Sequence, residues 1–293
     1  MSYPNNDISY EVKDEIGILT FNRPEARNAL TTDVRLGITQ VMLEIREKMN
    51  IKALVVTGSG GNFCAGGDIK SFQEMAPEPT ARRERVRRSH IWLDEFLNLE
   101  VPVIAAVDGA AMGAGFSIML ACDFIFCTPR ARCSGIFVRT GLIPDMGCLF
   151  LLPRLVGLQK ARELLYTGKI LKPDEMQALG LVTDVVDEDS LFDHAFNFAS
   201  RFRHASTTSI GITKNILNQS FHSDHRTISE LEAYGQAVCF DTDYHRDAID
   251  RFLTKKPAQF DWARLEKADK ADKADKADKA DKADKAGKAG LKD

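Results

Sequence analysis

The feature that most constrains the fold is a regular alternation of strand-like and helical segments from the N-terminus to about residue 205. Such alternation predicts an α/β layer structure with parallel strands. From Thr208 onward the periodic segments are helical only, so a helical region should follow the α/β core. The expected strands are Ile16–Phe21, Ala53–Thr57, Val103–Val107, Phe124–Cys127 and Val182–Val186, and the expected helices of the core are Thr32–Met49, Ile69–Leu99, Ala114–Ala121, Gln159–Tyr166, Pro173–Ala178 and Leu191–Arg203.

We expect three regions: a core over residues 1–206, a helical region over 207–262 and a low-complexity tail over 263–293. The tail repeats Lys-Ala-Asp and carries no apolar stripe at helical spacing, so it cannot dock on a core by hydrophobic burial. A solvated extension is the expectation for such a composition, with an interaction tail as the alternative.

Charge and apolar content exclude several classes of partner. The formal net charge is −3 and the pI is about 6.1, which argues against a nucleic-acid partner. The longest apolar run, Gly109 to Cys122, is shorter than the ~18–20 residues of a membrane span, and the polar N-terminus lacks the apolar stretch of a signal peptide. The six cysteines show no C-x-x-C spacing, so we expect no metal site, mostly buried thiols and a cytoplasmic location.

Two glycine-rich loops each follow a predicted strand and lead into a predicted helix. The first is GSGGNFCAGGDIK, in which Asp68 should cap the following helix and the amide of Gly67 could point at an anion. The second is DGAAMGAGFSIMLACD, in which small residues allow close approach to the amide of Ala114. Taken singly, each loop is also explained as a plain connection or as tight packing of small residues.

Taken together, the two loops suggest a common site. Ligands of α/β sheets bind at the carboxyl ends of the strands, where both loops are expected. Two convergent backbone amides can form an oxyanion hole, which stabilises negative charge on a carbonyl oxygen. The pattern therefore indicates chemistry beside a thioester or a similar carbonyl group.

At this point the chain resembles the enoyl-CoA hydratase/isomerase (crotonase) family, from about residue 8 to 262. The resemblance implies a spiral core of ββα turns, a C-terminal helical region used in trimer contacts, a homotrimer or hexamer, and an acyl-CoA substrate without a further cofactor. The motifs that carry it are LTFNRPEARNAL, VVTGSGGNFCAGGDIKSF, VPVIAAVDGAAMGAGFSIMLACDF, GLIPDMG, LLPRLVGLQKARELLYTGKIL and EMQALGLVTDVV.

The resemblance also implies roles for individual residues. The amides of Gly67 and Ala114 match the family's oxyanion hole, and the variable segment 70–100, together with Phe116 and Phe137, should line the acyl pocket. Positions that match contacts to coenzyme A are Ala26, Arg27, Ala65, Asp68, Ile69, Phe252, Lys255 and Lys256.

The sequence departs from the family's hydratases at both of their glutamates, which are matched here by Ser117 and Phe137. Neither side chain can shuttle the protons of a hydration. The remaining acid is Asp145, set among apolar residues such as Phe137, Leu142 and Met146, where desolvation should raise its pKa. Its context is most similar to ring-1,2-epoxyphenylacetyl-CoA isomerase-like and Δ3,Δ2-enoyl-CoA isomerase-like members, so a double-bond isomerase with Asp145 as acid and base is the leading hypothesis.

Several alternatives remain open at this stage. Asp145 could simply cap a helix that starts near Gly147. Asp145 and His90 could instead act as in the family's dehalogenase, with His90 otherwise a surface or packing residue. The chain could also be a hydratase or another lyase that uses Asp145 alone, or an acyl-CoA-binding member with little catalysis.

Overall fold

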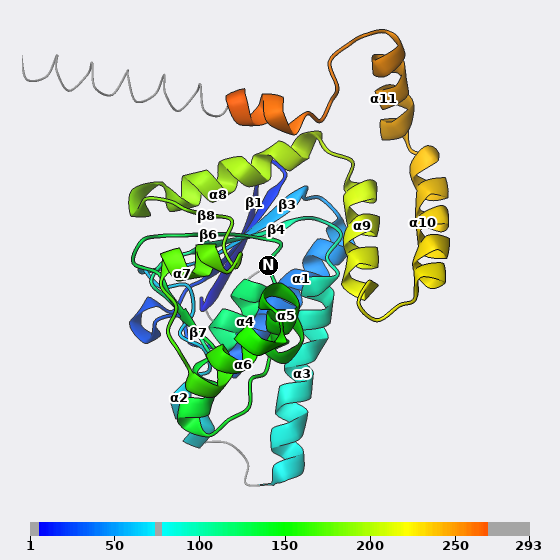
Figure 1. The fold of residues 1–293 in the computed structure, drawn as a ribbon. Coiled ribbons are helices and arrows are strands. Elements are labelled where there is room, and N and C mark those ends of the chain that lie inside the picture. The colour runs from blue at the N-terminus through cyan, green and yellow to red at the C-terminus, as the bar shows by residue number, and fades with distance from the viewer. Residues whose placement is uncertain (1–5, 74–77, 269–293) are drawn as a thin grey trace, which may run out of the picture. The chain divides into compact units, whose positions relative to one another are not determined.

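The computed structural model describes residues 6–73 and 78–268 (Figure 1). The chain divides into two compact units, the first ending at Cys239 and the second beginning at Phe240. The boundary expected after residue 206 coincides with the start of a helix at Thr207, and the three-region division stays a prediction. Most of the Lys-Ala-Asp tail, residues 269–293, lies outside the described residues.

The first unit is built on a mainly parallel sheet. Its strands and those of a smaller sheet are β1 (Ile8–Lys13), β2 (Ile16–Phe21), β3 (Ala53–Gly58), β4 (Val103–Val107), β5 (Ala110–Met112), β6 (Phe124–Cys127), β7 (Arg132–Ser134) and β8 (Asp184–Val185). The larger sheet has six strands in the order β1-β2-β3-β4-β6-β8, and β5 pairs with β7 in the smaller one. Every neighbouring pair is parallel except the β1–β2 hairpin, so the expected α/β class is confirmed. The sequence patterns missed the three-residue strands β5 and β7, and they missed β1 because only Ile8 of that strand is buried.

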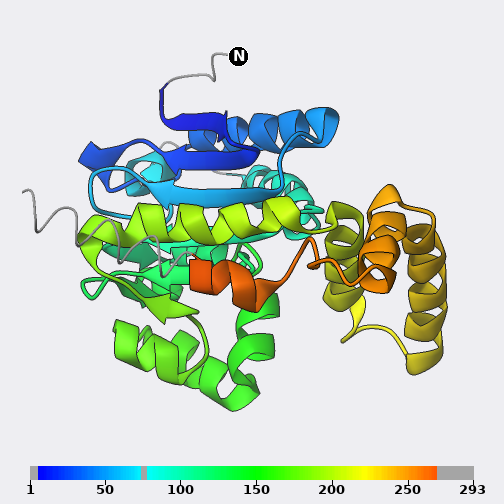
Figure 2. The ribbon, with the colours of Figure 1, turned by 90° about the horizontal axis from the view of Figure 1, so that it is seen from above.

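Both faces of the sheet are covered, which explains why its strands are apolar throughout. On β3, Leu54 and Val56 join the core shared with α1 (Thr32–Lys48) and α3 (Pro79–Leu97). On the opposite face, α8 (Leu191–Ser200) contacts β2, β3, β4 and β6, as Figures 1 and 2 show. Successive strand residues point to opposite faces, so one apolar strand serves both layers.

The helices follow the predictions with one correction. The single helix expected over Ile69–Leu99 is wrong, because two helices, α2 and α3, occupy this stretch on either side of residues 74–77. Pro79 is the first residue of α3, a position where its missing N–H costs nothing. The remaining helices are α2 (Ile69–Gln73), α4 (Ala114–Leu120), α5 (Cys148–Val156), α6 (Leu158–Thr167), α7 (Pro173–Ala178), α9 (Thr207–Gln219), α10 (His225–Phe240) and α11 (Asp243–Leu253).

Two findings concern partners. Within residues 6–73 and 78–268, no helix is long and apolar enough to cross a membrane. Over the same ranges, no group of three or more His, Cys, Asp or Glu side chains is arranged to hold a metal ion. Cys64, Cys122, Cys127, Cys133 and Cys148 are buried thiols outside any disulfide, as their apolar neighbours predicted.

Candidate active site

The two glycine-rich loops lie in direct backbone contact. The amide of Cys64 donates to the carbonyl of Ala110 over 2.8 Å, and the amide of Met112 donates to the carbonyl of Cys64 over 2.9 Å. A Cβ atom on Gly66 would lie 2.5 Å from the Met112 carbonyl oxygen and 3.5 Å from the Ala114 nitrogen. Gly66 also has a φ of +95°, a left-handed conformation that favours glycine. The loops can approach this closely only because residue 66 has no side chain.

Among the amides without a partner at this contact are those of Gly67 and Ala114. The amide of Leu30 donates to the carbonyl of Gly66, and the carbonyl of Leu30 accepts from the amide of Asp68. The amide of Gly67 lies between these two hydrogen-bonded groups in the chain. Ala114 is the first residue of α4, where backbone amides have no acceptor within the helix. Neither the Gly67 nor the Ala114 amide donates a hydrogen bond to any part of the chain that the structure describes. The pair can therefore donate to an external oxygen.

Asp145 lies in the loop between a 3-10 helix, η2 (Ile136–Thr140), and α5. Burial raises the pKa of its carboxyl group, and attraction to the positive charges of Arg35, His90 and Arg85 offsets this only in part. Its Oδ1 atom is buried and meets no hydrogen-bond donor among the described residues. A carboxyl group with a buried, unpaired oxygen atom and a raised pKa is suited to take up and return a proton.

The structure contradicts the helix-cap alternative for Asp145. The N-cap residue of α5 is Gly147 and not Asp145, and no side-chain cap hydrogen bond is formed there among the described residues. Met146 and Gly147 have φ values of +53° and +78°, so the chain turns sharply after Asp145. This turn separates the Asp145 carboxyl group from a capping position.

Sequence reasoning missed the role of Ser117 in holding Asp145. The Ser117 hydroxyl group donates to the main-chain carbonyl of Asp145 over 2.9 Å, and the amide of Cys148 donates to the same carbonyl over 3.1 Å. Ser117 is fully buried and lies on α4, one turn after Ala114. The helix that presents the Ala114 amide thus also positions the backbone of Asp145. The sequence could have indicated this role, because a serine within an otherwise apolar helix needs a hydrogen-bond partner.

The apolar residues expected near Asp145 differ in their exposure. Phe137 is buried on η2, with its ring 3.9 Å from where a Cβ on Gly113 would lie, so it borders the second glycine loop. Phe116 and Met146 are almost completely buried. Leu142 is 50% exposed, so it contributes less to the burial of Asp145 than the sequence suggested.

The positions matched to coenzyme A contacts in the core lie together. Arg27 follows a second 3-10 helix, η1 (Pro24–Ala26), and its carbonyl accepts from the amide of Ala65 over 2.9 Å. Asp68 accepts from the amides of Lys70 and Ser71 over 3.0 and 3.3 Å, which confirms it as the cap of α2. Although its partial burial acts the other way, bonds to Arg23 and to these amides lower the pKa of Asp68. Ala26 is half-buried, and Arg27 and Ile69 are exposed.

The C-terminal positions belong to the second unit. Phe252 lies near the end of α11 and is 81% exposed. Lys255 and Lys256 follow the helix, and Lys256 forms an ion pair of 3.5 Å with Asp250. Their part in coenzyme A binding stays a prediction.

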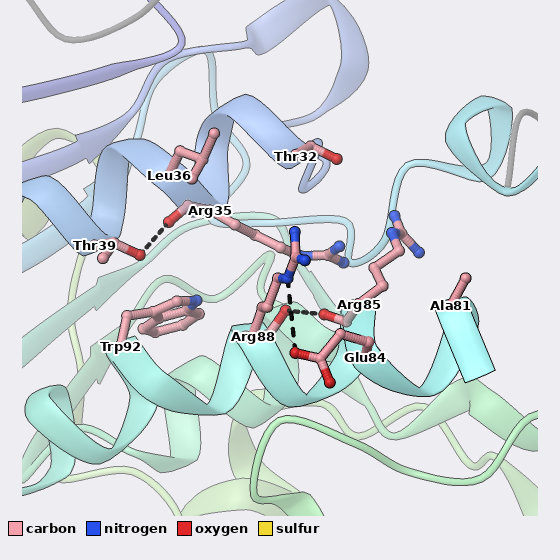
Figure 3. A pocket seen from close by; sticks show the side chains of 10 residues that line it. Thr32, Arg35, Leu36, Thr39, Ala81, Glu84, Arg85, Arg88 and Trp92 are labelled. Atoms are coloured by element: carbon pink, nitrogen blue, oxygen red, sulfur yellow. Dashed lines mark hydrogen bonds and ion pairs between the residues drawn. The ribbon is translucent and has the colours of Figure 1, made fainter. Parts of the chain in front are cut away.

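A cationic pocket lies between α1 and α3 (Figure 3). The sequence pointed to segment 70–100 as variable lining but did not single out Arg35 on α1, since one arginine in an amphipathic helix carries no signal of its own. His90, the alternative base, is exposed on α3, yet its charge acts on Asp145. The lining residues are Thr32, Arg35, Leu36, Thr39, Ala81, Glu84, Arg85, Arg88, Ser89 and Trp92.

Comparison with known proteins shows the family of the chain. The sequence profile described as Enoyl-CoA hydratase/isomerase matches residues 11–263. The chain is 31% identical over 261 residues to crotonyl-CoA hydratase of Syntrophomonas wolfei, covering 89% of this chain and 99% of that protein. It is 29% identical over 251 residues to 1,2-epoxyphenylacetyl-CoA isomerase of Escherichia coli, covering 85% and 96%. Hydratase is the commonest description among such relatives.

Solved structures show the same fold. An enoyl-CoA hydratase/isomerase from Cupriavidus metallidurans superposes with a TM-score of 0.83 at 37% identity, over 87% of this chain and 96% of that one. A protein from Streptomyces coelicolor, described as an enoyl-CoA hydratase, superposes with a TM-score of 0.84 at 28% identity, over 89% and 96%.

Proposed function

We propose that this chain, which belongs to the enoyl-CoA hydratase/isomerase family, moves a carbon–carbon double bond within an enoyl-CoA thioester. The observation that carries the proposal is the half-buried Asp145 carboxyl group, whose pKa is raised and whose buried Oδ1 atom meets no donor among the described residues. Such a group can act first as a base and then as an acid.

The reaction would run in two proton transfers. The substrate's thioester oxygen accepts hydrogen bonds from the amides of Gly67 and Ala114. The Asp145 carboxylate removes a proton from the α carbon of a 3-enoyl-CoA, and the electron pair moves into an enolate on the thioester oxygen. The enolate is stabilised by the two amides. Protonation of the γ carbon by the Asp145 carboxylic acid then gives the conjugated 2-enoyl-CoA and restores the carboxylate.

The same residues argue against hydration as the main activity. The positions that match the hydratases' two glutamates hold Ser117 and Phe137. The Ser117 hydroxyl group is engaged with the Asp145 carbonyl, and Phe137 has no ionisable group. Hydration needs groups that position a water molecule and supply a proton. The names of the relatives favour hydratase activity as the second candidate function.

The remaining site residues support binding of the thioester. Ala26, Arg27, Ala65, Asp68 and Ile69 are proposed to hold the coenzyme A portion, with Arg27 as a partner for phosphate. The C-terminal Phe252, Lys255 and Lys256 are proposed to add contacts to the same portion. The reaction requires no group beyond the carboxyl group and the two amides.

A homotrimer or a hexamer is part of the proposal. Helices α5 and α6 expose Leu149, Leu155 and Leu158, and α10 exposes Tyr234 and Val238, which are large apolar side chains of the kind buried in stable interfaces. Light scattering after size exclusion should give about three or six times the chain mass of 32.6 kDa. A mass equal to one chain would contradict this part of the proposal.

The assignment is tested by comparing two reactions of the purified protein. A 3-enoyl-CoA should be converted to the 2-enoyl-CoA by the wild type, and the Asp145→Asn variant should lose this activity by roughly 10²–10⁴-fold. Addition of water to a 2-enoyl-CoA should be slow in both proteins. Fast hydration that survives in the variant would overturn the isomerase proposal and favour a hydratase with a different acid.

A further inference from the structure

The pocket between α1 and α3 has no role in the proposed proton transfers. It is a cavity of about 430 Å³, which is large enough for part of a small ligand. Leu36 and Ala81 supply apolar surface, while Arg35, Arg85 and Arg88 supply positive charge. In Figure 3 these three arginine side chains extend toward one another from the two helices.

Positive charge dominates the lining. Among the described residues, Glu84 is the single acidic residue that lines the cavity, and it lies 3.8 Å from Arg88. Arg85 donates to the hydroxyl group of Ser71 over 3.0 Å. The pocket thus combines three guanidinium groups with one carboxylate, and this imbalance favours an anionic ligand.

Arg35 is the least satisfied of the three arginines. Its Nε atom is buried and donates to no acceptor in the part of the chain that the structure describes. Burial lowers the pKa of Arg35 to about 10, and repulsion from Arg85 adds to this effect. The indole Nε1 of Trp92 is a second buried donor without an acceptor among the described residues. Buried donors of this kind are costly unless a ligand pairs with them.

The pocket is electrostatically linked to the acid of the active site. The charges of Arg35 and Arg85 both act on the carboxyl group of Asp145. Helix α3 also packs against the loop of Asp145, since the Leu93 side chain lies 3.2 Å from where a Cβ on Gly147 would lie. A group that occupies the pocket would therefore lie near the proposed position of the acyl chain. The positions matched to coenzyme A phosphates are Ala26 and Arg27, which do not line this pocket.

We propose that the pocket receives a carboxylate at the far end of the acyl group, so that the preferred substrates are enoyl-CoA thioesters of dicarboxylic acids. This inference rests on the proposed function, because it assumes that the acyl group lies beside Asp145. Arg35 is the main partner, since a planar guanidinium group can bind a carboxylate through two parallel hydrogen bonds. Arg85 and the indole of Trp92 provide further positive charge and a further donor.

Binding of unreactive thioesters tests the pocket without relying on turnover. Adipoyl-CoA and hexanoyl-CoA have acyl chains of equal length and differ in the terminal carboxylate, and calorimetry can compare their dissociation constants. The wild type should bind adipoyl-CoA at least about tenfold more tightly, as expected for a charge-assisted pair. Arg35→Gln should remove most of this preference and leave the affinity for hexanoyl-CoA within about twofold.

Matched variants and a third ligand make each outcome decisive. Arg83→Gln removes a charge from the same helix α3 but outside the pocket lining, and it should keep the preference. Arg85→Gln should reduce the preference and provides a second test if Arg35→Gln folds poorly. Equal affinity of the wild type for both thioesters would overturn the inference alone, whereas no binding of either thioester would overturn the proposed function. If Arg35→Gln weakened the binding of free coenzyme A, the pocket would be assigned to a phosphate group of coenzyme A. That result would also overturn the inference.

Discussion

The Ser117 hydroxyl group donates a 2.9 Å hydrogen bond to the main-chain carbonyl of Asp145. This bond links the helix that begins at Ala114 to the loop that carries the acid. The proposed donor to the thioester oxygen and the proposed proton shuttle thereby lie on two segments that a hydrogen bond joins. A serine at this position does not replace the missing glutamate of a hydratase, but it supports the acid that remains.

Ser117→Ala should slow isomerisation by about five- to tenfold with little change in KM, because one hydrogen bond worth about 1 kcal/mol positions Asp145. Steady-state kinetics on a 3-enoyl-CoA measure this effect. Ser134→Ala is the matched control, since the Ser134 hydroxyl group is buried and accepts or donates no hydrogen bond within the described residues. Equal rates for the two variants would show that the hydrogen bond from Ser117 to Asp145 does not contribute to the rate of isomerisation.

Gly66→Ala should reduce activity by about 10²-fold or more, because the added Cβ would lie 2.5 Å from the Met112 carbonyl and push the two loops apart. The left-handed φ of +95° adds strain of about 1–3 kcal/mol. Activity and thermal unfolding should be compared with those of Gly180→Ala, whose φ is +70° but whose Cβ would meet no atom within 4 Å. A similar loss of activity in both variants would attribute the effect to backbone strain alone.

The rate of isomerisation should rise with pH and then level off. Asp145 must be ionised to remove the α proton, and burial raises its pKa above the ordinary value of 3.8. The midpoint of the acidic limb of the kcat/KM–pH profile should therefore lie at a higher pH than the midpoint that an exposed aspartate would give. A profile that is flat down to about pH 4 would contradict the assignment of Asp145 as the base.

Asp145→Asn should raise the melting temperature at neutral pH. A raised pKa means that the folded chain binds the Asp145 proton more tightly than the unfolded chain does, so the ionised carboxylate costs stability. This cost develops as the pH rises from the ordinary value of 3.8 through the raised pKa, and asparagine avoids it. The gain in melting temperature should therefore shrink as the pH falls toward 4. A variant less stable than wild type at pH 7 would contradict this prediction.

The fold was largely predictable from its strand and helix periodicities, because parallel strands buried on both faces have a strong apolar signal. The exceptions have local causes. The edge strand β1 buries only Ile8, and residues 69–99 show a continuous helical pattern although the chain forms two helices there. Periodicity reports which face is buried, and it does not report where a helix is interrupted.

The sequence predicted the contact between the two glycine-rich loops, because both follow strands of one parallel sheet. The amides of Gly67 and Ala114 have no acceptor among the described residues, and their role as an oxyanion hole stays a prediction. The supporting side chains were harder to find, because Ser117 bonds to a residue distant in sequence and Arg35 acts on the same residue through its charge. A single sequence does not specify such tertiary pairs.

The most direct test of the central claim is NMR of a 3-enoyl-CoA in D2O with wild-type protein and with Asp145→Asn. The account predicts that the wild type moves the double bond, with the new γ hydrogen drawn from the α carbon or, after exchange of the Asp145 proton, from solvent deuterium. Bond migration and deuterium uptake should both disappear in the variant. Migration and uptake that continue at the wild-type rate in Asp145→Asn would show that another group moves the proton.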